Sequence, residues 1–449
     1  MPPKPDSPVR RHLRCQSLAL WCAGIAVGIV SLLVSSCAPS LHSQGVQHLE
    51  DQQYDEAINA FVQELKKDST RAEVWRDLGI ALARKNDQRA LVALERALAL
   101  DPDDGATIYA LGSYYEDRAQ YDKALDYYRR FIEFGFLSGS AGDLEDRLEY
   151  LVQKSFESEA RAAVEGEKAL SVAALPDSTI AVLNFKNLGR NSDLDPLQKG
   201  LADMVITDLS KVKALRVVER ARIQKLVEEI GFGSSGLVDE ASAPRVGRLV
   251  GARTLVKGSY LDLSESTIRL DAGTANTAAG SFARADEVTG DLAQFFRLEK
   301  QLVLGIIDDL GVALSQEERK AIMEIPTESL LAFMAYSRAI DAEDRGQYTE
   351  AYNDYQQAIQ YDPGFTMAQQ QMLRVDRISR GMRARPRLEM YFKMMRTRSA
   401  ARRQLQAIGF RVYAGYLSSL QARKALQELN SEEGFGSVKV RVEIPLPPP

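Results

Sequence analysis

The sequence predicts a protein of the α plus α/β multidomain class, and three observations support that prediction. Three alanines, Ala57, Ala90 and Ala124, follow one another at spacings of 33 and 34 residues, which indicates stacked helical repeats. From residue 179 onward, short apolar strands alternate with amphipathic helices, as in an α/β sheet with crossover helices. The repeat pattern then returns once after Pro326. We therefore expect N-terminal helical repeats, a central α/β sandwich-like domain, an isolated further helical repeat and a small C-terminal α/β element.

Residues 1–36 have the pattern of a secretory signal peptide. A basic start ends at Arg14, the 17 residues Leu18–Val34 carry no charge, and two serines precede Cys37. This arrangement resembles the lipobox of bacterial lipoproteins. The resemblance implies that Cys37 is acylated, with palmitate among the acyl groups, and becomes the mature N-terminus before a lipidated linker over 37–44. Because Ala38 and not Asp follows, it also implies retention at the outer membrane. The alternative is a transmembrane anchor, since 17 residues are the lower limit for crossing a bilayer.

The usual catalytic side chains are scarce in this chain. The last cysteine is Cys37 and the last histidine is His48, so the body of the protein contains neither residue type. Thiol catalysis, a Ser-His-Asp arrangement and a zinc site with nitrogen or sulfur ligands are therefore excluded there. We expect no catalytic residues, no metal site and no cofactor, and hence no enzyme. A mature protein whose single cysteine carries the lipid also has no intramolecular disulfide.

Residues 45–170 carry the clearest repeat motif. Its best unit is Trp75-x-x-Leu78-Gly79-x-x-Leu82, followed by Ala90. Spacing and residue types resemble the tetratricopeptide repeat, which implies stacked antiparallel helix pairs that bind protein partners. Gly79 and Ala90 should lie where two helices touch. The segment from Glu145 to Leu170 is expected to be a capping or connecting helix.

Residues 178–316 are predicted to form the α/β domain. The predicted strands are 179–185, 215–218 and 254–260, and the predicted helices are 196–211, 221–230 and 243–250. A short hairpin of 266–271 and 280–285 should lie at the sheet edge, and 294–314 should form a closing helix. Gly231-Phe-Gly-Ser-Ser-Gly236 matches the letters of a dinucleotide fingerprint. We interpret it as a flexible loop, because it leaves a helix and no apolar helix follows before Pro244.

Several blocks of this domain occur in a recognisable order, including Val218-Glu219-Arg220, Ser235–Asp239 and Gly251–Ser259. They resemble the periplasmic domain of the curli-secretion-channel (CsgG-type) lipoprotein family. The resemblance implies a periplasm-facing lipoprotein that serves a secretion or surface-structure system. Channel-forming members carry long alternating strands that cross the membrane, with about 10 residues per crossing. The segment Ser264–Ala285 is the only hairpin candidate and contains Asp271 and a run of Ala, Gly and Thr. We therefore predict that this protein makes no pore by itself.

Residues 327–383 repeat the tetratricopeptide pattern once. Ala351, Tyr355, Ala358 and Asp362-Pro363 match its second helix, and Leu331–Ala342 would form its first. One helix pair cannot bury its own apolar face. It should therefore pack on the α/β domain, on the helix that runs to Arg383, or on the N-terminal repeats, and the sequence leaves these three options open.

Residues 384–444 begin within a strongly basic stretch. Between Arg374 and Lys424 there are fourteen Lys or Arg residues and two acids. Behind an export signal this pattern excludes nucleic acid and favours anionic lipid headgroups, cell-wall acids or an acidic protein surface. The alternative is a helix with a solvated basic face. The candidate contacts with an anionic surface are Arg383, Arg385, Arg387, Arg396, Arg398, Arg402 and Arg403.

The C-terminal part is predicted to be a strand at 409–416, a helix from Ser418 or Ser419 to Leu429, and a strand at 437–443. This order resembles one half of the SPOR peptidoglycan-binding domain. A small α/β cap that pairs with another sheet is the alternative. Residues 445–449 are predicted to be a disordered tail.

Together these features predict a lipid-anchored scaffold or assembly factor at the outer membrane. It would face the periplasm and bind protein partners of a secretion or surface-structure system through its helical repeats. Two alternatives stay open: a subunit of a pore-forming curli-type secretion channel, and a peptidoglycan-binding lipoprotein of envelope maintenance. A homo-oligomer is compatible with each of these, and the sequence names neither the partner nor the pathway.

Overall fold

The structure is a computed structural model that describes residues 40–133, 141–170, 175–231, 242–277 and 282–416. The proposed signal peptide and Cys37 lie outside these residues. The chain divides into two compact units, Met1–Leu388 and Glu389–Pro449. Within the described ranges, no helix is both long and apolar enough to cross a bilayer.

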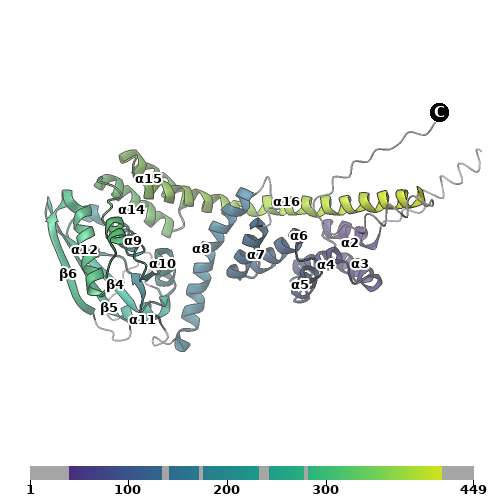
Figure 1. Cartoon of the computed structure of the whole chain (residues 1–449), viewed down its shortest axis with the longest axis horizontal. Helices are drawn as coiled ribbons and strands as arrows, with labels where there is room; N and C mark the ends of the chain where they lie inside the picture. Colours follow the sequence, from purple (N-terminus) through teal and green to yellow (C-terminus); the bar gives the residue numbers. More distant parts are fainter. Residues whose placement is uncertain (1–39, 134–140, 171–174, 232–241, 278–281, 417–449) are drawn as a thin grey trace, which may run out of the picture. The chain divides into compact units, whose positions relative to one another are not determined.

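Three helix pairs form the N-terminal array (Figure 1). Close packing at small residues explains the repeat pattern. A Cβ added to Gly79 would lie 2.7 Å from the Leu94 side chain, and one added to Gly112 would lie 2.6 Å from the Tyr128 ring. Ala90 is fully buried. The predicted helix contact at Gly79 and Ala90 is therefore confirmed. The pairs are α2 (Leu41–Glu50) with α3 (Tyr54–Lys67), α4 (Ala72–Arg84) with α5 (Arg89–Leu100), and α6 (Gly105–Glu116) with α7 (Tyr121–Glu133).

The predicted linker over 37–44 is wrong in its last four residues, because α2 begins at Leu41. The Ser40 hydroxyl caps this helix by accepting a hydrogen bond from the Ser43 N–H at 3.1 Å. His42 is buried, and its Nε2 lies 2.8 Å from Asp77 Oδ2. The first repeat is thus a complete helix pair.

A mixed sheet of six strands forms the centre of the α/β domain, which confirms the predicted fold class. Its order is β3-β1-β4-β5-β6, and β2 pairs separately with β4. β1 is parallel to β3 and β4, whereas β4, β5 and β6 form an antiparallel meander. The strands are β1 (Thr179–Val182), β2 (Lys186–Asn187), β3 (Arg216–Val217), β4 (Thr254–Ser264), β5 (Thr267–Asn276) and β6 (Phe282–Asp291).

Helices cover both faces of this sheet. α9 (Leu197–Leu209) and α12 (Phe295–Asp309) share a core with Ile180, Val182 and Tyr260. On the other face, α10 (Arg220–Glu229), α11 (Ala243–Val250) and α8 (Ala141–Glu165) share a core with Ala181 and Leu255. The helix predicted to cap the repeats therefore also packs on the sheet.

The predicted hairpin of 266–271 and 280–285 is confirmed as an antiparallel pair at the sheet edge, but its strands are longer than predicted. β5 and β6 each have ten residues, and β5 lies between β4 and β6. The small residues Ala272 and Ala275 suggested a loop, but both are buried, one in each of the two cores. The close cover of helices on both faces explains why this part of the strand has small side chains.

The predicted closing helix 294–314 is observed as α12, which ends earlier than predicted, and a separate helix follows it. α12 ends at Asp309, and Gly311 adopts a left-handed φ of 67°. α13 (Gln316–Ile322) then begins with a capping box, in which Ser315 and Glu318 bond each other's backbone N–H.

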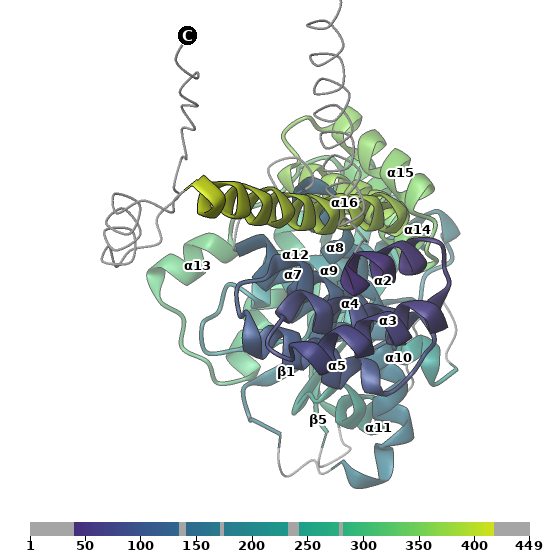
Figure 2. The same cartoon turned by 90° about the vertical axis from the view of Figure 1, so that its right-hand side faces the viewer.

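The further repeat packs on the α/β domain, which resolves one of the options that the sequence left open. α14 (Leu330–Asp344) and α15 (Tyr348–Tyr361) lie side by side in both views (Figure 1, Figure 2). Phe333 and Tyr336 of α14 belong to the same core as α9 and α12. Gly200 of α9 allows this approach, because a side chain there would collide with Ser337.

The predicted strand at 409–416 is wrong, because these residues end the long helix α16 (Thr366–Tyr416). The preceding Ala, Arg, Gln and Leu residues favour helix, and extending an existing helix requires no new nucleation. The predicted boundary at 383/384 also lies inside α16. The predicted helix to Leu429, the strand at 437–443 and the tail at 445–449 lie outside the described residues.

Candidate interaction surfaces

A chain of buried polar groups links the first helices of the three repeat pairs. Asp77 contacts His42 and also accepts a hydrogen bond from Arg76 Nε at 3.0 Å. Arg76 Nη1 donates to Asp104 Oδ2, also at 3.0 Å. Burial alone would lower the pKa of Arg76, but the charges of Asp77 and Asp104 raise it. These groups satisfy one another, so we assign them to repeat stacking and not to ligand binding.

A second buried network lies where α14 meets the α/β domain. Lys199 Nζ is 2.8 Å from carboxylate oxygens of both Asp341 and Asp344. Arg220 Nη2 lies 2.9 Å from Asp344 Oδ1. Burial alone would raise the pKa of Asp344, but the positive charges of Arg220 and Lys199 hold it below its usual value.

Asp203 extends this network, because it accepts a hydrogen bond from the Tyr336 hydroxyl at 2.6 Å. Burial raises the pKa of Asp203, although Arg220 opposes the change. Sequence reasoning missed these residues. The available signal was the presence of Lys199 and Asp203 four residues apart in an otherwise amphipathic helix.

The first part of α16 forms ion pairs with acids of α6, α8 and α14. Arg380 Nε lies 2.8 Å from Asp146 Oδ2, and Arg374 pairs with Glu343. Two of the predicted anionic-surface residues lie here: Arg385 is 3.1 Å from Glu116 and also pairs with Asp117, and Arg387 is 2.6 Å from Asp143. These two arginines therefore already have acidic partners within the chain.

The other predicted basic residues are placed differently. Arg383 is exposed, and Arg396 is buried. Arg398, Arg402 and Arg403 lie in α16, but the structure does not describe their side chains. Among the predicted residues, Arg385 and Arg387 thus pair with acids of the chain itself.

Arg147 of α8 joins these contacts to the backbone of α16. Pro386 lies inside this helix and has no N–H to donate to the carbonyl of Met382. Arg147 Nη1 is 3.5 Å from that carbonyl oxygen and donates to the Gly381 carbonyl at 2.9 Å. Its Nη2 donates to Glu116 at 2.5 Å. The Arg147 guanidinium therefore supplies N–H donors to α16 where Pro386 has none. The same guanidinium also binds Glu116 of the repeat array.

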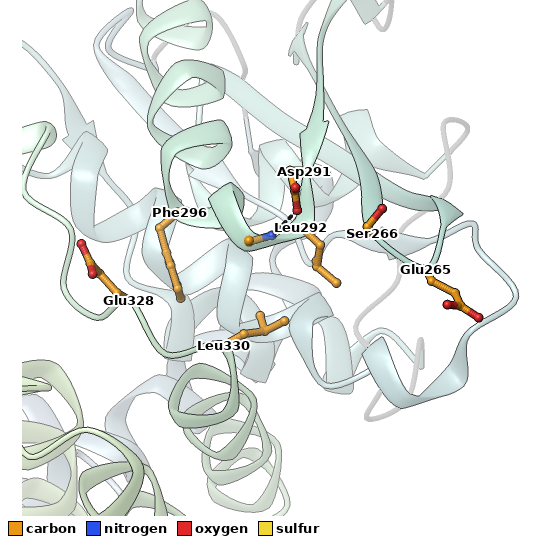
Figure 3. A pocket seen from close by; sticks show the side chains of 8 residues that line it. Glu265, Ser266, Asp291, Leu292, Phe296, Glu328 and Leu330 are labelled. Carbon is orange, nitrogen blue, oxygen red and sulfur yellow. Dashed lines mark hydrogen bonds between the residues drawn. The ribbon is translucent and has the colours of Figure 1, made fainter.

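A hollow of about 320 Å³ opens at the end of the sheet (Figure 3). Its floor is apolar, with Phe296 almost fully buried, and three carboxylates lie among its lining residues. No histidine or cysteine lines it, so the hollow has no nucleophile–base pair of the usual kinds. The lining residues are Glu265, Ser266, Asp291, Leu292, Ala293, Phe296, Glu328 and Leu330.

The described residues do not include the predicted lipid site at Cys37. Within the described ranges, no group of three His, Cys, Asp or Glu side chains is positioned to hold a metal ion. Cys37 lies outside these ranges, so its lipidation stays a prediction.

Residues 152–324 match the protein-family model described as "Curli production assembly/transport component CsgG". We call this segment the CsgG-type domain. The match confirms the resemblance found in the sequence, and it starts earlier than the predicted boundary at 178. The early start agrees with the packing of α8 on the sheet, where Ala160 belongs to the same core as Leu255.

Among curated proteins, the chain is similar to "Putative adenylate cyclase 3" of Rhizobium meliloti (strain 1021). The two sequences are 24% identical over 193 residues, which are 42% of this chain. The matched part spans 31% of the length of that protein, so less than a third of it is comparable.

Similar solved structures include an LpoB domain, a lipoprotein and a tetratricopeptide repeat protein. The LpoB C-terminal domain from Salmonella enterica is 14% identical with a TM-score of 0.23, and the match covers 30% of this chain and 97% of that one. Lipoprotein GNA1162 from Neisseria meningitidis is 12% identical with a TM-score of 0.23, covering 31% and 99%. A tetratricopeptide repeat protein from Parabacteroides merdae is 11% identical with a TM-score of 0.23, covering 75% and 97%.

Proposed function

We propose that this protein is a lipid-anchored scaffold or assembly factor at the outer membrane, facing the periplasm and serving a secretion or surface-structure system. The observation that carries the proposal is that the helical repeats and the CsgG-type domain belong to one compact unit. Repeats of this kind bind protein segments, and the CsgG-type domain belongs to a family named for assembly and transport. The chain would hold the helical repeats and the CsgG-type domain at a fixed distance from each other.

The contacts between these parts support a rigid scaffold. α8 packs on the sheet of the CsgG-type domain and also forms ion pairs with α16, which in turn pairs with Glu116 of the repeat array. At the crossing of α8 and α16, a Cβ on Gly381 would collide with the carbonyl oxygen of Asp146. Helices that approach this closely have little freedom to slide.

We also propose that the protein is not an enzyme. The hollow at the sheet end lacks a nucleophile–base pair, and the buried ionisable groups of the repeat array and of the α14 contact are paired with one another. A test for cyclase activity of the purified chain addresses the named relative directly; formation of cyclic nucleotide would overturn this part of the proposal.

The anchor is tested by replacing its lipid-bearing cysteine. Cys37→Ser should move the protein from the membrane fraction to the soluble fraction, because the thiol that carries the acyl chains is lost. Cys22→Ser is the matched control, since it changes a cysteine inside the proposed leader. Membrane retention of the Cys37→Ser protein would place the anchor elsewhere.

The scaffold role is tested by crosslinking in intact envelopes followed by identification of the captured proteins. We expect components of one secretion or surface-structure system, and we expect their loss when the repeat array at 40–133 is deleted. Capture of the same set without the array would show that the repeats are not the partner site.

A subunit of a secretion pore is the second candidate, and the family match over residues 152–324 favours it. The two functions differ in a single-channel measurement on the purified, lipidated protein. Ring-shaped oligomers with conductance would replace the scaffold proposal. Peptidoglycan binding stays a third prediction; sedimentation of the full chain with purified cell wall, compared with a chain that ends at Tyr416, would test it.

A further inference from the structure

The last strand of the sheet has one edge that is unoccupied within the part of the chain that the structure describes. β6 pairs with β5 on one side, and the sheet order ends there. Figure 1 shows β6 at the rim of the domain with no other element beyond it. A free edge presents backbone N–H and C=O groups that another extended segment can pair with.

Two of the devices that block an edge strand, proline and a β-bulge, are missing from the second half of β6. It contains no proline, and its irregular pairing with β5 is confined to the region opposite Gly273 and Ala275. From Asp286 to Asp291 the register with β5 is continuous. Six residues of regular strand are long enough to accept a peptide of similar length.

Charge on β6 selects among the segments that could pair with it. The strand contains Arg284 and three acids, Asp286, Glu287 and Asp291, which gives a net charge of −2. Asp286 faces α12, because its carboxylate lies against Gly305, and so Glu287 and Asp291 lie on the opposite face.

On that opposite face the acids extend onto the neighbouring strand. Glu287 is directly opposite Asp271 of β5, and its side chain is 57% exposed. Arg269 lies 3.1 Å from Asp271 and 3.9 Å from Glu287, so one cation serves two acids. Pairing of two β6 edges from separate copies would bring these acids together. A basic segment would relieve the same repulsion.

The hollow lies at the end of this strand. Asp291 is the last residue of β6, and Leu292 follows it into the hollow, where Phe296 and Leu330 complete an apolar floor (Figure 3). Glu265 and Glu328 add two exposed carboxylates to its lining. A segment with an apolar side chain next to a lysine or arginine therefore fits this site. The apolar side chain would contact the floor, and the cation would contact the surrounding carboxylates.

We propose that the outer edge of β6 and the hollow form a docking site for an extended segment of a partner protein in which aliphatic residues alternate with lysine or arginine. The segment adds a strand to the sheet. Its basic side chains face Glu287 and Asp291, and one aliphatic side chain at its end occupies the hollow. The inference depends neither on the lipid anchor nor on the repeats as a partner site.

The test uses the full chain and two labelled heptapeptides, one with alternating Val and Lys and one with alternating Val and Glu. Fluorescence anisotropy should report binding of the Val/Lys peptide, weakened by added salt, and no binding of the Val/Glu peptide. Equal binding of both peptides, or binding of neither, would overturn the proposal.

Charge reversal then locates the site. Glu287→Lys and Glu265→Lys should each weaken binding of the Val/Lys peptide by about tenfold, the change expected for a lost charge pair. Glu317→Lys reverses an exposed acid on α13 and should leave the affinity unchanged. The proposal fails if all three variants bind as the parent does, or if Glu317→Lys weakens binding equally.

Proline substitution tests the strand edge itself. Neighbouring residues of a strand point their N–H groups to opposite sides, so only one of Val288→Pro and Thr289→Pro interrupts the ladder to β5. The variant that keeps the parental melting temperature has lost an outward N–H, and it should lose peptide binding. Parental affinity in that variant would exclude β-strand addition.

Discussion

At the scale of single residues, one carboxylate is placed unusually deep in the protein. Glu299 of α12 is fully buried, and Lys300 Nζ lies 3.1 Å from its Oε2. That ammonium group has a closer partner, Asp208 Oδ2, at 2.5 Å. Burial, reinforced by the negative charge of Asp208, raises the pKa of Glu299 to about 8 from a usual value near 4.5. The folded protein therefore holds a proton on Glu299 at neutral pH.

This proton makes stability depend on pH. Between pH 4.5 and about 8 the unfolded chain loses a proton that the folded chain keeps, so the free energy of unfolding falls as pH rises. Glu299→Gln removes the ionisable group and should flatten this part of the profile. We expect the variant to match the parent near pH 5 and to melt at a higher temperature above pH 8, in thermal unfolding followed by circular dichroism.

Glu317→Gln is the matched control for this prediction, because Glu317 is exposed. Its melting temperature should follow that of the parent at every pH. A Glu299→Gln protein that is less stable than the parent at pH 8 would show that the buried carboxylate is ionised and stabilises Lys300 by its charge.

Gly381 is a second residue whose size matters more than its chemistry. Alanine is usually the better helix former by about 1 kcal/mol, but at this position its Cβ would collide with the backbone of α8. Gly381→Ala should therefore lower the free energy of unfolding by about 1–3 kcal/mol, as overpacking does. Gly142→Ala is the control within α8, since a Cβ there meets nothing within 4 Å. It should be neutral or stabilising in urea denaturation; equal effects of both changes would refute the close crossing.

At the scale of elements, a buried arginine supports the packing of α14 on the α/β domain. Arg220 is the first residue of α10, and its side chain is 9% exposed. Arg220→Met would leave Asp203 and Asp344 with less positive charge in a buried site. We expect a loss of about 3–5 kcal/mol in chemical denaturation, because removing one partner leaves uncompensated buried acids.

Arg222, two residues further along α10, gives the comparison. It pairs with Glu159 at 2.9 Å, but its side chain is 49% exposed. Arg222→Met should cost only about 0–1 kcal/mol, the usual value for a surface pair. Similar losses for the two variants would mean that burial does not decide the strength of these pairs.

The sequence predicted the helices and strands better than it predicted the contacts between them. Local periodicity was enough for helices such as α9 and α11, whose apolar residues repeat at helical spacing. It failed for the end of β5, where Ala272 and Ala275 are small because helices press on both faces, a fact set by distant segments. It also failed at 409–416, where helix extension overrode an apparent strand pattern. The partners of Lys199 lie more than 140 residues away in sequence, and no local pattern could identify them.

At the scale of the whole molecule, the predicted domains are less separate than their sequence patterns. The repeat array, the CsgG-type domain and the α14/α15 pair all lie in the unit Met1–Leu388. α8 and the first part of α16 connect them through ion pairs and through buried apolar residues. Basic residues that the sequence assigned to an external surface, such as Arg385, act within the molecule.

These ion pairs should couple the unfolding of the array to that of the CsgG-type domain. Arg380, Arg385 and Arg387 are each between a third and about half exposed, and a single pair of this kind contributes about 0–1 kcal/mol. Replacing all three by alanine also leaves the buried Glu116 with one cation fewer. In differential scanning calorimetry we expect the parent to unfold in one main transition. The triple variant should show a second transition at lower temperature, from the array alone.

The matched control changes three exposed basic residues of the array, Lys66, Lys67 and Arg96, to alanine. It removes the same formal charge and should keep the single transition. Added salt should move the parent toward the behaviour of the triple variant, because screening weakens half-exposed pairs most. If the triple variant still unfolds in one transition at the parental temperature, the apolar contacts of α16 with α8 suffice to join the two parts, and its arginines remain available for a partner.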